Sequence, residues 1–352
     1  MTRIRRNAAI AAATAATTGL LALAVGACVG DSPPAAGTPA VPEAGTNTGP
    51  AEGGADTGLP PVGGGMITDD AAVADAGKDA HAPTCAGQVF ATPALVVTAL
   101  VSGALATTMW GLRVVGPNAY FSAVPSGGSE QQLFRATFAP GAGGAAPTLS
   151  NASVVAPPSS ASVVEWAPTV STDSALLVFA TGFPPPRNLS LSIGSGGAFA
   201  APGPIAALNT AQDETDPWLV GKPVATALYF ARDNGASSME IWRSAVSAGP
   251  LFAAPTKIAL VCPQLNCGTP VVTPDETTLL YASWATSGFV PNVEESPLAV
   301  AAGTGTAGAA IGHPELGSRY PSWVSDDGCE VLLGGGGIST INDMYYARRV
   351  AK

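Results

Sequence analysis

Short apolar runs recur along the second half of the chain at a nearly constant spacing. Each run follows a phrase that contains proline and an acidic residue, and the runs are residues 176–179, 228–231, 279–282 and 331–333. Measured between Pro168, Pro217, Pro270 and Pro321, successive repeats are 49, 53 and 51 residues long. A period near fifty residues that carries strand, acidic turn and strand predicts a β-propeller, in which each repeat is one blade.

A second phrase, a polar or acidic residue followed by an aromatic strand, completes each repeat. Its clearest copies are residues 240–245 and 343–348, and a copy at 132–136 marks a less regular fifth repeat that begins near Val114. We therefore expect an all-β fold with a single propeller of five blades, or of six if residues 94–109 hold another short blade. A doubly wound α/β fold is not favoured, because no segment keeps a helical periodicity over ten residues with caps.

The phrase that closes two of the repeats also occurs near the start of the folded part. Phe-Ala-Ala-Pro stands at 199–202 and 252–255, and Phe-Ala-Thr-Pro stands at 90–93, whereas the last repeat ends directly after its third strand. We expect the N-terminal segment to supply the outer strand of the C-terminal blade, which closes the ring and leaves no end blade unpaired.

The composition agrees with many short strands joined by turns. The 352 residues include 42 glycines and 32 prolines, and only 11% of them are charged. The formal net charge of −10 becomes −13 without Arg3, Arg5 and Arg6, which lie in a segment that we expect to be removed. Because phosphate binding depends on clustered Lys and Arg, an acidic chain without a basic stripe excludes DNA and RNA as expected partners.

The first 27 residues have the pattern of an export signal. Three arginines precede the uncharged stretch 7–27, which ends in small residues directly before Cys28. This junction resembles the lipobox of bacterial lipoproteins, although Val25 stands where that family prefers Leu, and the resemblance implies a lipid on Cys28. Since Val29 is not the Asp that retains lipoproteins in the inner membrane, an outer-membrane anchor is implied. A transmembrane anchor is the alternative, but a span of Ala and Thr inserts weakly.

Residues 28–84 form a Gly/Pro/Ala-rich acidic segment. It holds eight carboxylates against Lys78 and no aromatic residue, so it cannot offset the entropy of ordering, and we expect a disordered tether. Asp69, Asp70 and Asp79 could suggest calcium, but they lack the ligand spacing of a known loop, and a solvated acidic run is the preferred interpretation. Residues 85–352 are then the propeller domain.

The repeats resemble a known family most closely in the last blade. Pro-Ser-Trp-Val-Ser-Asp-Asp-Gly at 321–328, followed by an apolar strand and by Asp-Met-Tyr-Tyr-Ala-Arg at 343–348, looks like the WD40-like (PD40) repeats of the TolB-like propellers. The similarity covers residues 114–352 and departs where Gly-Lys-Pro at 221–223 replaces the Asp-Gly turn. It implies a periplasmic or lipoprotein interaction scaffold. We expect a monomer whose partner is a protein or an envelope polysaccharide such as peptidoglycan.

Four cysteines remain once Cys28 is assigned to the lipid. The short spacing of Cys262 and Cys267 favours a local disulfide, which leaves Cys85 to pair with Cys329 and to join the N-terminal segment to the last blade. Zinc at Cys262 and Cys267 is one alternative, although His313 is the sole histidine of residues 85–352, and free thiols are another.

The sequence motifs give little support for nucleophilic catalysis or for cofactor binding. His81 lies in the expected tether, and we interpret His313, in front of a proline, as a surface loop residue with no nucleophile motif in sight. The four glycines at 334–337 lack the Lys-Ser/Thr of a phosphate loop and predict a flexible hairpin tip. We expect no cofactor and no metal.

Carboxylates are the remaining candidates for chemistry, because five-bladed propellers include glycosidases with acids around the central funnel. The candidates recur just before or within the hairpin turns: Asp213, Glu214, Asp216, Asp275, Glu276, Asp326 and Asp327. Recurrence is also what turn capping predicts, and we interpret Asp173, Asp275, Asp326 and Asp327 as turn acids of the repeats. No acid clearly breaks the repeat symmetry, although Glu165, Glu294 and Glu295 are off its pattern.

The recurring tryptophans admit two interpretations. At strand positions they favour packing between blades, and a carbohydrate or peptide platform is the alternative; they are Trp166, Trp218, Trp242, Trp284 and Trp323. Taken together, the sequence predicts a lipid-anchored propeller, facing the periplasm or the cell surface, that binds a partner through its funnel or loop face. A glycan hydrolase or lyase with funnel carboxylates is the alternative function.

Overall fold

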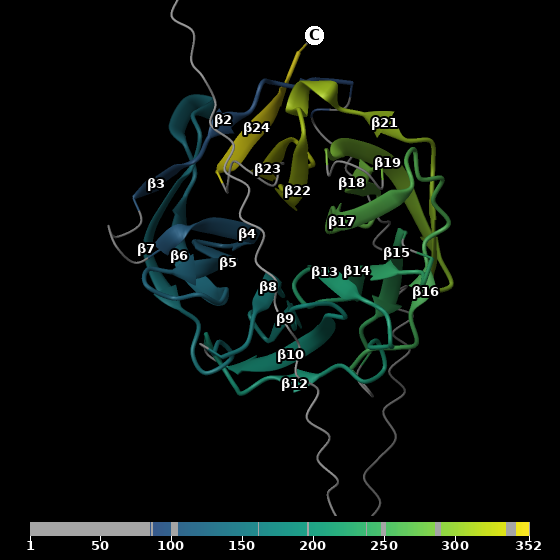
Figure 1. Ribbon diagram of the computed structural model, residues 1–352. Helices are drawn as coiled ribbons and strands as arrows, with labels where there is room; N and C mark the ends of the chain where they lie inside the picture. The colour runs from purple at the N-terminus through teal and green to yellow at the C-terminus, as the bar shows by residue number, and fades with distance from the viewer. Residues whose placement is uncertain are drawn as a thin grey trace, which may run out of the picture. The chain divides into compact units, whose positions relative to one another are not determined.

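Five sheets, antiparallel except where β3 joins β7, are arranged as the blades of a propeller around a common central axis, which we call the channel (Figure 1). The computed structural model describes residues 85, 87–99, 105–160, 162–195, 197–236, 238–247, 251–285, 290–335 and 343–351. The expected signal segment, Cys28, the tether and His81 therefore lie outside the described residues. So do positions 336 and 337 of the glycine run.

Each blade is built from strands that follow one another from the channel outwards. Blade 1 comprises β4 (Leu105–Val115), β5 (Asn118–Pro125), β6 (Gln132–Ala139) and β7 (Thr148–Val154), with β3 (Val97–Ala99) parallel to β7. Blade 2 comprises β8 (Glu165–Val170), β9 (Leu176–Thr181), β10 (Asn188–Ser195), β11 (Ala198–Phe199) and β12 (Gly203–Pro204). Blade 3 comprises β13 (Glu214–Val220), β14 (Ala227–Asp233), β15 (Met239–Ala245) and β16 (Thr256–Lys257).

The last two blades contain the short helical turn and both ends of the described chain. Blade 4 comprises β17 (Asn266–Val272), β18 (Thr278–Trp284), β19 (Asn292–Ala301), β20 (Thr304–Ala307) and β21 (Ile311–Gly312), and a 3-10 turn, η2 (Pro314–Leu316), follows it. Blade 5 comprises β22 (Arg319–Val324), β23 (Glu330–Gly335), β24 (Met344–Val350), β1 (Val89–Phe90) and β2 (Ala94–Leu95). A second 3-10 turn, η1 (Ala142–Gly144), lies in the β6–β7 connection.

The ring closes as the repeated phrase predicts. Phe90 of β1 pairs with Arg349 of β24, and Leu95 of β2 pairs with Tyr345 of the same strand. The five-bladed all-β fold is therefore confirmed, and the six-blade alternative is wrong. The described part of residues 94–109 supplies β2, β3 and the start of β4 instead of a further blade, and blade 1 begins at Leu105, before the predicted Val114.

Two disulfides join the cysteines in the expected pairs. Cys85 is bonded to Cys329, with their Cα atoms 5.6 Å apart, and Cys262 is bonded to Cys267, with a Cα separation of 5.9 Å. The first bond fastens the N-terminal segment to the β22–β23 turn. Because all four thiols are used in disulfides, the zinc and free-thiol alternatives for these cysteines are wrong.

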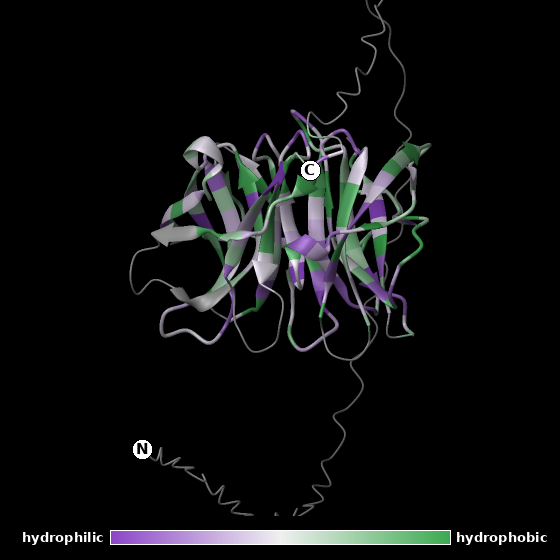
Figure 2. Ribbon diagram, turned by 90° about the horizontal axis from the view of Figure 1, so that it is seen from above, coloured by the Kyte–Doolittle hydropathy of each residue, from purple (hydrophilic) through white to green (hydrophobic). Residues whose placement is uncertain are grey.

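The apolar runs of the repeats form the second strand of each blade and are fully buried. Leu177, Phe179, Leu228, Phe230, Leu279, Tyr281, Val331 and Leu333 are at most 1% exposed. In the side view of Figure 2, hydrophobic and hydrophilic positions alternate along the strands. Burial of each large side chain contributes about 1.5–3 kcal/mol, so the central strands hold the blades together.

The innermost strands share a bulge that faces the channel. Their pairing with the second strand shifts register at this point, and the bulge residues Gly111, Ala167, Asp216 and Thr269 have φ values of 61°, 46°, 50° and 48°. In β22 the register shifts between Pro321 and Trp323. We call the end of the channel at which the innermost strands begin the channel mouth, and the opposite end the channel base.

Candidate functional site

The hairpin turns at the channel base carry three acids with the same structural role. Asp173 accepts hydrogen bonds from the Ser171 hydroxyl (2.5 Å) and from the Ala175 N–H (3.1 Å). Asp275 and Asp327 accept the same two kinds of bond in blades 4 and 5. These bonds hold the turn backbone in place, as Asp side chains do in many turns.

Asp326 differs from its neighbour Asp327, although the sequence groups both with the turn acids. It forms an ion pair with Lys222 of blade 3, across the channel base. A cavity of about 340 Å³ lies here and is lined by Arg113, Lys222 and Asp326, among others. Burial lowers the pKa of Arg113 to about 9, although the charge of Asp326 opposes that shift. The guanidinium carbon of Arg113 lies 3.8 Å from the centroid of the Trp218 ring.

The acids around the start of β13 lie at the opposite end of the channel from the hairpin turns, so their grouping with the turn acids is wrong. Asp213 forms an ion pair with Arg187 (2.6 Å); burial opposes its charge, but the hydrogen bonds and charge of Arg187 outweigh burial and hold the pKa below its ordinary value. Glu214 is fully buried, pairs with Arg232 (3.0 Å) and accepts from the Thr210 hydroxyl (2.6 Å). Both acids are compensated structural groups.

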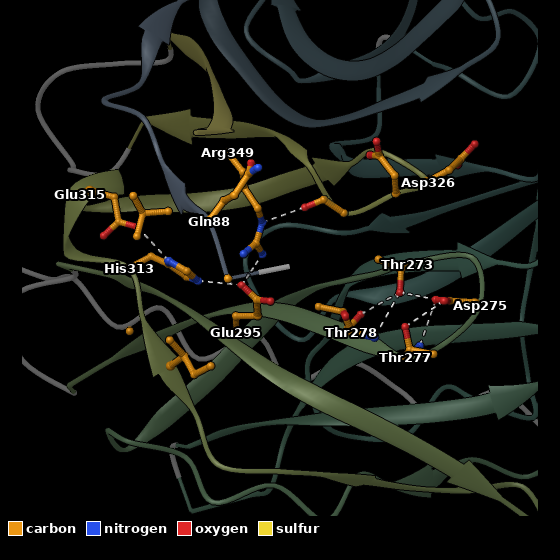
Figure 3. A pocket seen from close by; sticks show the side chains of 16 residues that line it. Gln88, Thr273, Asp275, Thr277, Thr278, Glu295, His313, Glu315, Asp326 and Arg349 are labelled. Carbon is orange, nitrogen blue, oxygen red and sulfur yellow. Dashed lines mark hydrogen bonds and ion pairs between the residues drawn. The ribbon is translucent and has the colours of Figure 1, made fainter. Parts of the chain in front are cut away.

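His313 is buried, in contrast to the predicted surface position. Only 7% of it is exposed; Nε2 lies 2.8 Å from Glu295 and Nδ1 lies 3.0 Å from Glu315 (Figure 3). Burial favours the neutral imidazole, but the two carboxylates outweigh burial and raise the pKa of His313. The cluster borders a cavity of about 460 Å³ between blades 4 and 5, and Arg349 donates to Glu295 at 2.5 Å.

The recurring acid Glu276 and the off-pattern acids Glu294 and Glu165 also have fixed partners. Glu276 binds Arg243 and the Tyr229 hydroxyl, and Glu294 accepts from Ser283 (2.9 Å). Glu165 is 2% exposed, and burial raises its pKa to about 7 although Ser159 and Ser160 donate hydrogen bonds to it.

Asp216 is the acid that breaks the repeat symmetry. It occupies the bulge position at which blades 1, 2 and 4 carry Gly111, Ala167 and Thr269. Its side chain borders a cavity of about 50 Å³ at the channel mouth, which we call the mouth cavity. Burial raises the pKa of Asp216 to about 6, although the charge of Arg187 and the N–H of Thr269 oppose that shift. The sequence contained the signal, because the residue before Pro217 aligns with those before Pro168 and Pro270.

Aromatic side chains from several blades surround the mouth cavity. We call Trp110, Trp166 and Tyr320, which line the cavity, the aromatic collar; Trp284 packs against Tyr320 from outside the cavity lining. Ring centroids are 5.9 Å apart for Trp110 and Trp166, and 6.0 Å apart for Trp110 and Tyr320. Gly268 admits Trp284, because a Cβ at that position would lie 2.8 Å from the indole.

The remaining tryptophans pack within the propeller. Trp218 is buried and its indole N–H donates to the carbonyl of Val272 in blade 4 (2.9 Å), while Trp323 packs against Phe138 of blade 1. Trp242 lies beside Arg232, whose guanidinium carbon is 4.6 Å from the ring centroid.

A metal site and a membrane-spanning helix are both missing from the part of the chain that the structure describes. Within it, no three His, Cys, Asp or Glu side chains gather closely enough to hold a metal ion. No helix among these residues has the length and apolar character needed to cross a bilayer.

Comparison with known proteins finds only distant similarity to solved structures. No model of a known protein family and no curated protein matches the chain. TolB from Acinetobacter baumannii is 10% identical, with a TM-score of 0.42 over 74% of this chain; the chain spans only 54% of the length of that protein. A putative TolB from Agrobacterium tumefaciens is 12% identical. The similarity covers 67% of this chain and 72% of that chain, with a TM-score of 0.40.

A glycosidase propeller is similar to the same degree. The α-L-arabinofuranosidase PaAbf62A from Podospora anserina is 12% identical, with a TM-score of 0.44 over 75% of this chain and 97% of that chain. At such identities and TM-scores we draw no functional conclusion from either kind of neighbour.

Proposed function

We propose that this protein is a lipid-anchored, extracytoplasmic propeller that binds a partner, a protein or a cell-envelope polymer, at the channel mouth. The observation that carries the proposal is a lone carboxylate, Asp216, in a cavity walled by the aromatic collar. Aromatic rings beside a fixed charge form a surface suited to ligand recognition, whereas most glycoside hydrolysis uses a pair of carboxyl groups.

Glycan hydrolysis is less well supported by the same geometry. Glycosidases need two carboxyl groups that flank the scissile bond, one of them an acid and the other a base or nucleophile. Among the described residues that line the mouth cavity, Asp216 is the only carboxylate, while Asp213 and Glu214 are held by Arg187 and Arg232. We therefore propose that the protein is not an enzyme.

The face around the channel mouth also exposes apolar side chains in its loops. Phe183, in the β9–β10 loop, is 68% exposed, and Val290, in the β18–β19 loop, is 59% exposed. Apolar loop residues on a rigid scaffold are a common basis of partner binding.

The proposed location follows from the N-terminal sequence and from the disulfides. Lipidation of Cys28 would hold the propeller at the outer membrane, and two disulfides suit an oxidising compartment outside the cytoplasm. We propose that the chain acts there as a monomer.

Crosslinking mass spectrometry on intact cells tests this function. The wild-type chain should crosslink to a defined envelope partner, and Phe183→Ser should weaken that crosslink. Val224→Ser is the matched control, because Val224 is 55% exposed but lies in the β13–β14 turn at the channel base. Cys28→Ser should release the chain from the membrane fraction.

Two outcomes would contradict the proposal. One is that no partner is captured, or that Phe183→Ser weakens the crosslink no more than Val224→Ser does. The other is release of soluble sugar from cell-wall polysaccharide by the purified chain, since this would establish hydrolysis.

A further inference from the structure

The charge of Asp216 has no ionic partner at the channel mouth. Arg187 is the cation whose charge acts on Asp216, but it is already paired with Asp213 at 2.6 Å, and Asp216 itself takes part in no ion pair with any described residue. Arg113 lies over Trp218 and borders the base cavity, not the mouth cavity. One negative charge is therefore left to be balanced.

The other groups around Asp216 suit a cation. Trp110, Trp166 and Tyr320 line the mouth cavity, and an ammonium group placed over an aromatic ring face is attracted by about 0.5–2 kcal/mol. The guanidinium carbon of Arg187 already lies 6.0 Å from the Trp166 ring centroid, so a ligand would meet chiefly the rings of Trp110 and Tyr320. The hydroxyl oxygen of Thr269, which also lines this cavity, is buried and has no hydrogen-bond partner among the described residues. It is available to accept a hydrogen bond next to the carboxylate.

The size of the mouth cavity narrows the choice of cation. At 50 Å³ it has room for about four water molecules, which corresponds to an ammonium group with its last methylene groups. A sugar ring is larger than this space. A carboxylate and a hydroxyl also favour a cation that can donate hydrogen bonds, which a quaternary ammonium cannot do.

We propose that the mouth cavity binds a primary ammonium group, the side chain of a lysine presented by a protein partner, with Asp216 as its counter-ion and the aromatic collar as its wall. This inference rests on the binding role proposed above and specifies what is bound.

Ionisation of Asp216 should control the affinity. Its pKa of about 6 means that roughly nine-tenths of the groups carry charge at pH 7 and about one-tenth at pH 5. Lysine binding should therefore weaken about tenfold between these two pH values, because the lysine itself stays charged.

The test uses the full chain and titrates it with N-acetyl-lysine amide at constant ionic strength, followed by the indole N–H signals of the labelled tryptophans. A dissociation constant on the order of 1 mM is expected for one buried ammonium group. N-acetyl-norleucine amide has nearly the same shape without the charge, and it should not bind. Tetramethylammonium chloride should bind more weakly than the lysine probe, because it cannot donate to Asp216.

Variants separate this site from general electrostatics. Asp216→Asn should weaken lysine binding at least tenfold, and it should fold, because Asn tolerates the positive φ of 50° at this position. Thr269→Val removes the hydroxyl acceptor and should weaken binding a few-fold. Glu130→Gln changes the net charge by the same amount outside the mouth cavity and should leave the affinity unchanged.

Equal binding of the norleucine and lysine probes, or full binding by Asp216→Asn, would overturn the inference. If that happens while Phe183→Ser still weakens crosslinking to a partner, the inference fails and the proposed binding function remains. If no partner is captured from cells, the proposed function itself fails.

Discussion

Glu165 is a single buried side chain that couples folding to pH. Its pKa is about 7 in the folded chain because of burial, against 4.5 as its ordinary value, so the folded state holds the proton more tightly. Its contribution to stability is complete below pH 4.5 and is lost as pH rises to 7. We expect the free energy of unfolding to fall by up to about 3 kcal/mol across this window.

Urea unfolding of Glu165→Gln at pH 4.5 and pH 8 measures this effect. The variant should lose most of the pH slope and should be more stable than wild type at pH 8, because it carries no charge to bury. Glu130→Gln, in the β5–β6 loop, should keep the wild-type slope. An unchanged slope in Glu165→Gln would assign the pH dependence to other groups.

Single-residue roles were the hardest to predict from sequence. Asp327 and Asp216 belong to similar phrases, yet one holds a turn at the channel base and the other faces the mouth cavity. The sequence predicts a surface position for His313, because it stands in a loop before a proline. The contact of its ring with Phe90 of the N-terminal strand β1 cannot be predicted from the residues around it. Trp110 and Trp284 occupy different strands of different blades, so no shared spacing relates them before the ring is formed.

The bulge of β4 provides a test of how the innermost strands pack. Gly111 and Gly116 both have positive φ values, 61° and 55°, but a Cβ at Gly111 would lie 2.3 Å from the Cα of Ala167 in β8, while Gly116 faces open space. Gly116→Ala should cost about 1 kcal/mol for the left-handed backbone alone. Gly111→Ala should cost about 2–4 kcal/mol, because β4 and β8 must also move apart.

Denaturant unfolding of the two variants gives both values in one series. Equal losses would mean that β4 and β8 accommodate the added methyl group without a measurable cost. The second strands of blades 2 to 5 could be predicted from the sequence, because the fifty-residue period and the apolar runs reflect burial within each blade. The start of blade 1 could not, since β4 has no proline phrase to mark it.

The two disulfides should differ in their effect on stability. The Cys85–Cys329 bond closes a loop of 244 residues and the Cys262–Cys267 bond one of 5, so loop-closure entropy predicts about 5 and about 2 kcal/mol. Each pair is replaced by serines and unfolded in urea. A larger loss for the Cys262–Cys267 pair would show that chain entropy does not dominate, and loss of folding in the Cys85–Cys329 variant alone would support the prediction.

One histidine lies where the two ends of the ring meet and contacts three parts of it. His313 lies between Glu295 of β19 and Glu315 of η2, and its ring packs edge-on against Phe90 of β1 at 5.1 Å. A neutral imidazole has one N–H, so it cannot donate to both carboxylates, and the charged form fits this site best. The sequence predicted the closure through the Phe-Ala-Thr-Pro phrase, but this contact appears only when the ends of the ring meet.

Because the pKa of His313 is raised on folding, its contribution to stability is complete below pH 6.5 and is lost as pH rises through the folded value. Hydrogen exchange, corrected for intrinsic rates, should therefore show that protection of β1 falls between pH 6 and pH 9, while β13 stays protected. His313→Gln should make β1 exchange fast already at pH 6. If β1 kept the same protection across this range in the wild-type chain, closure of the ring would depend on the Cys85–Cys329 bond and strand pairing and not on the protonated histidine.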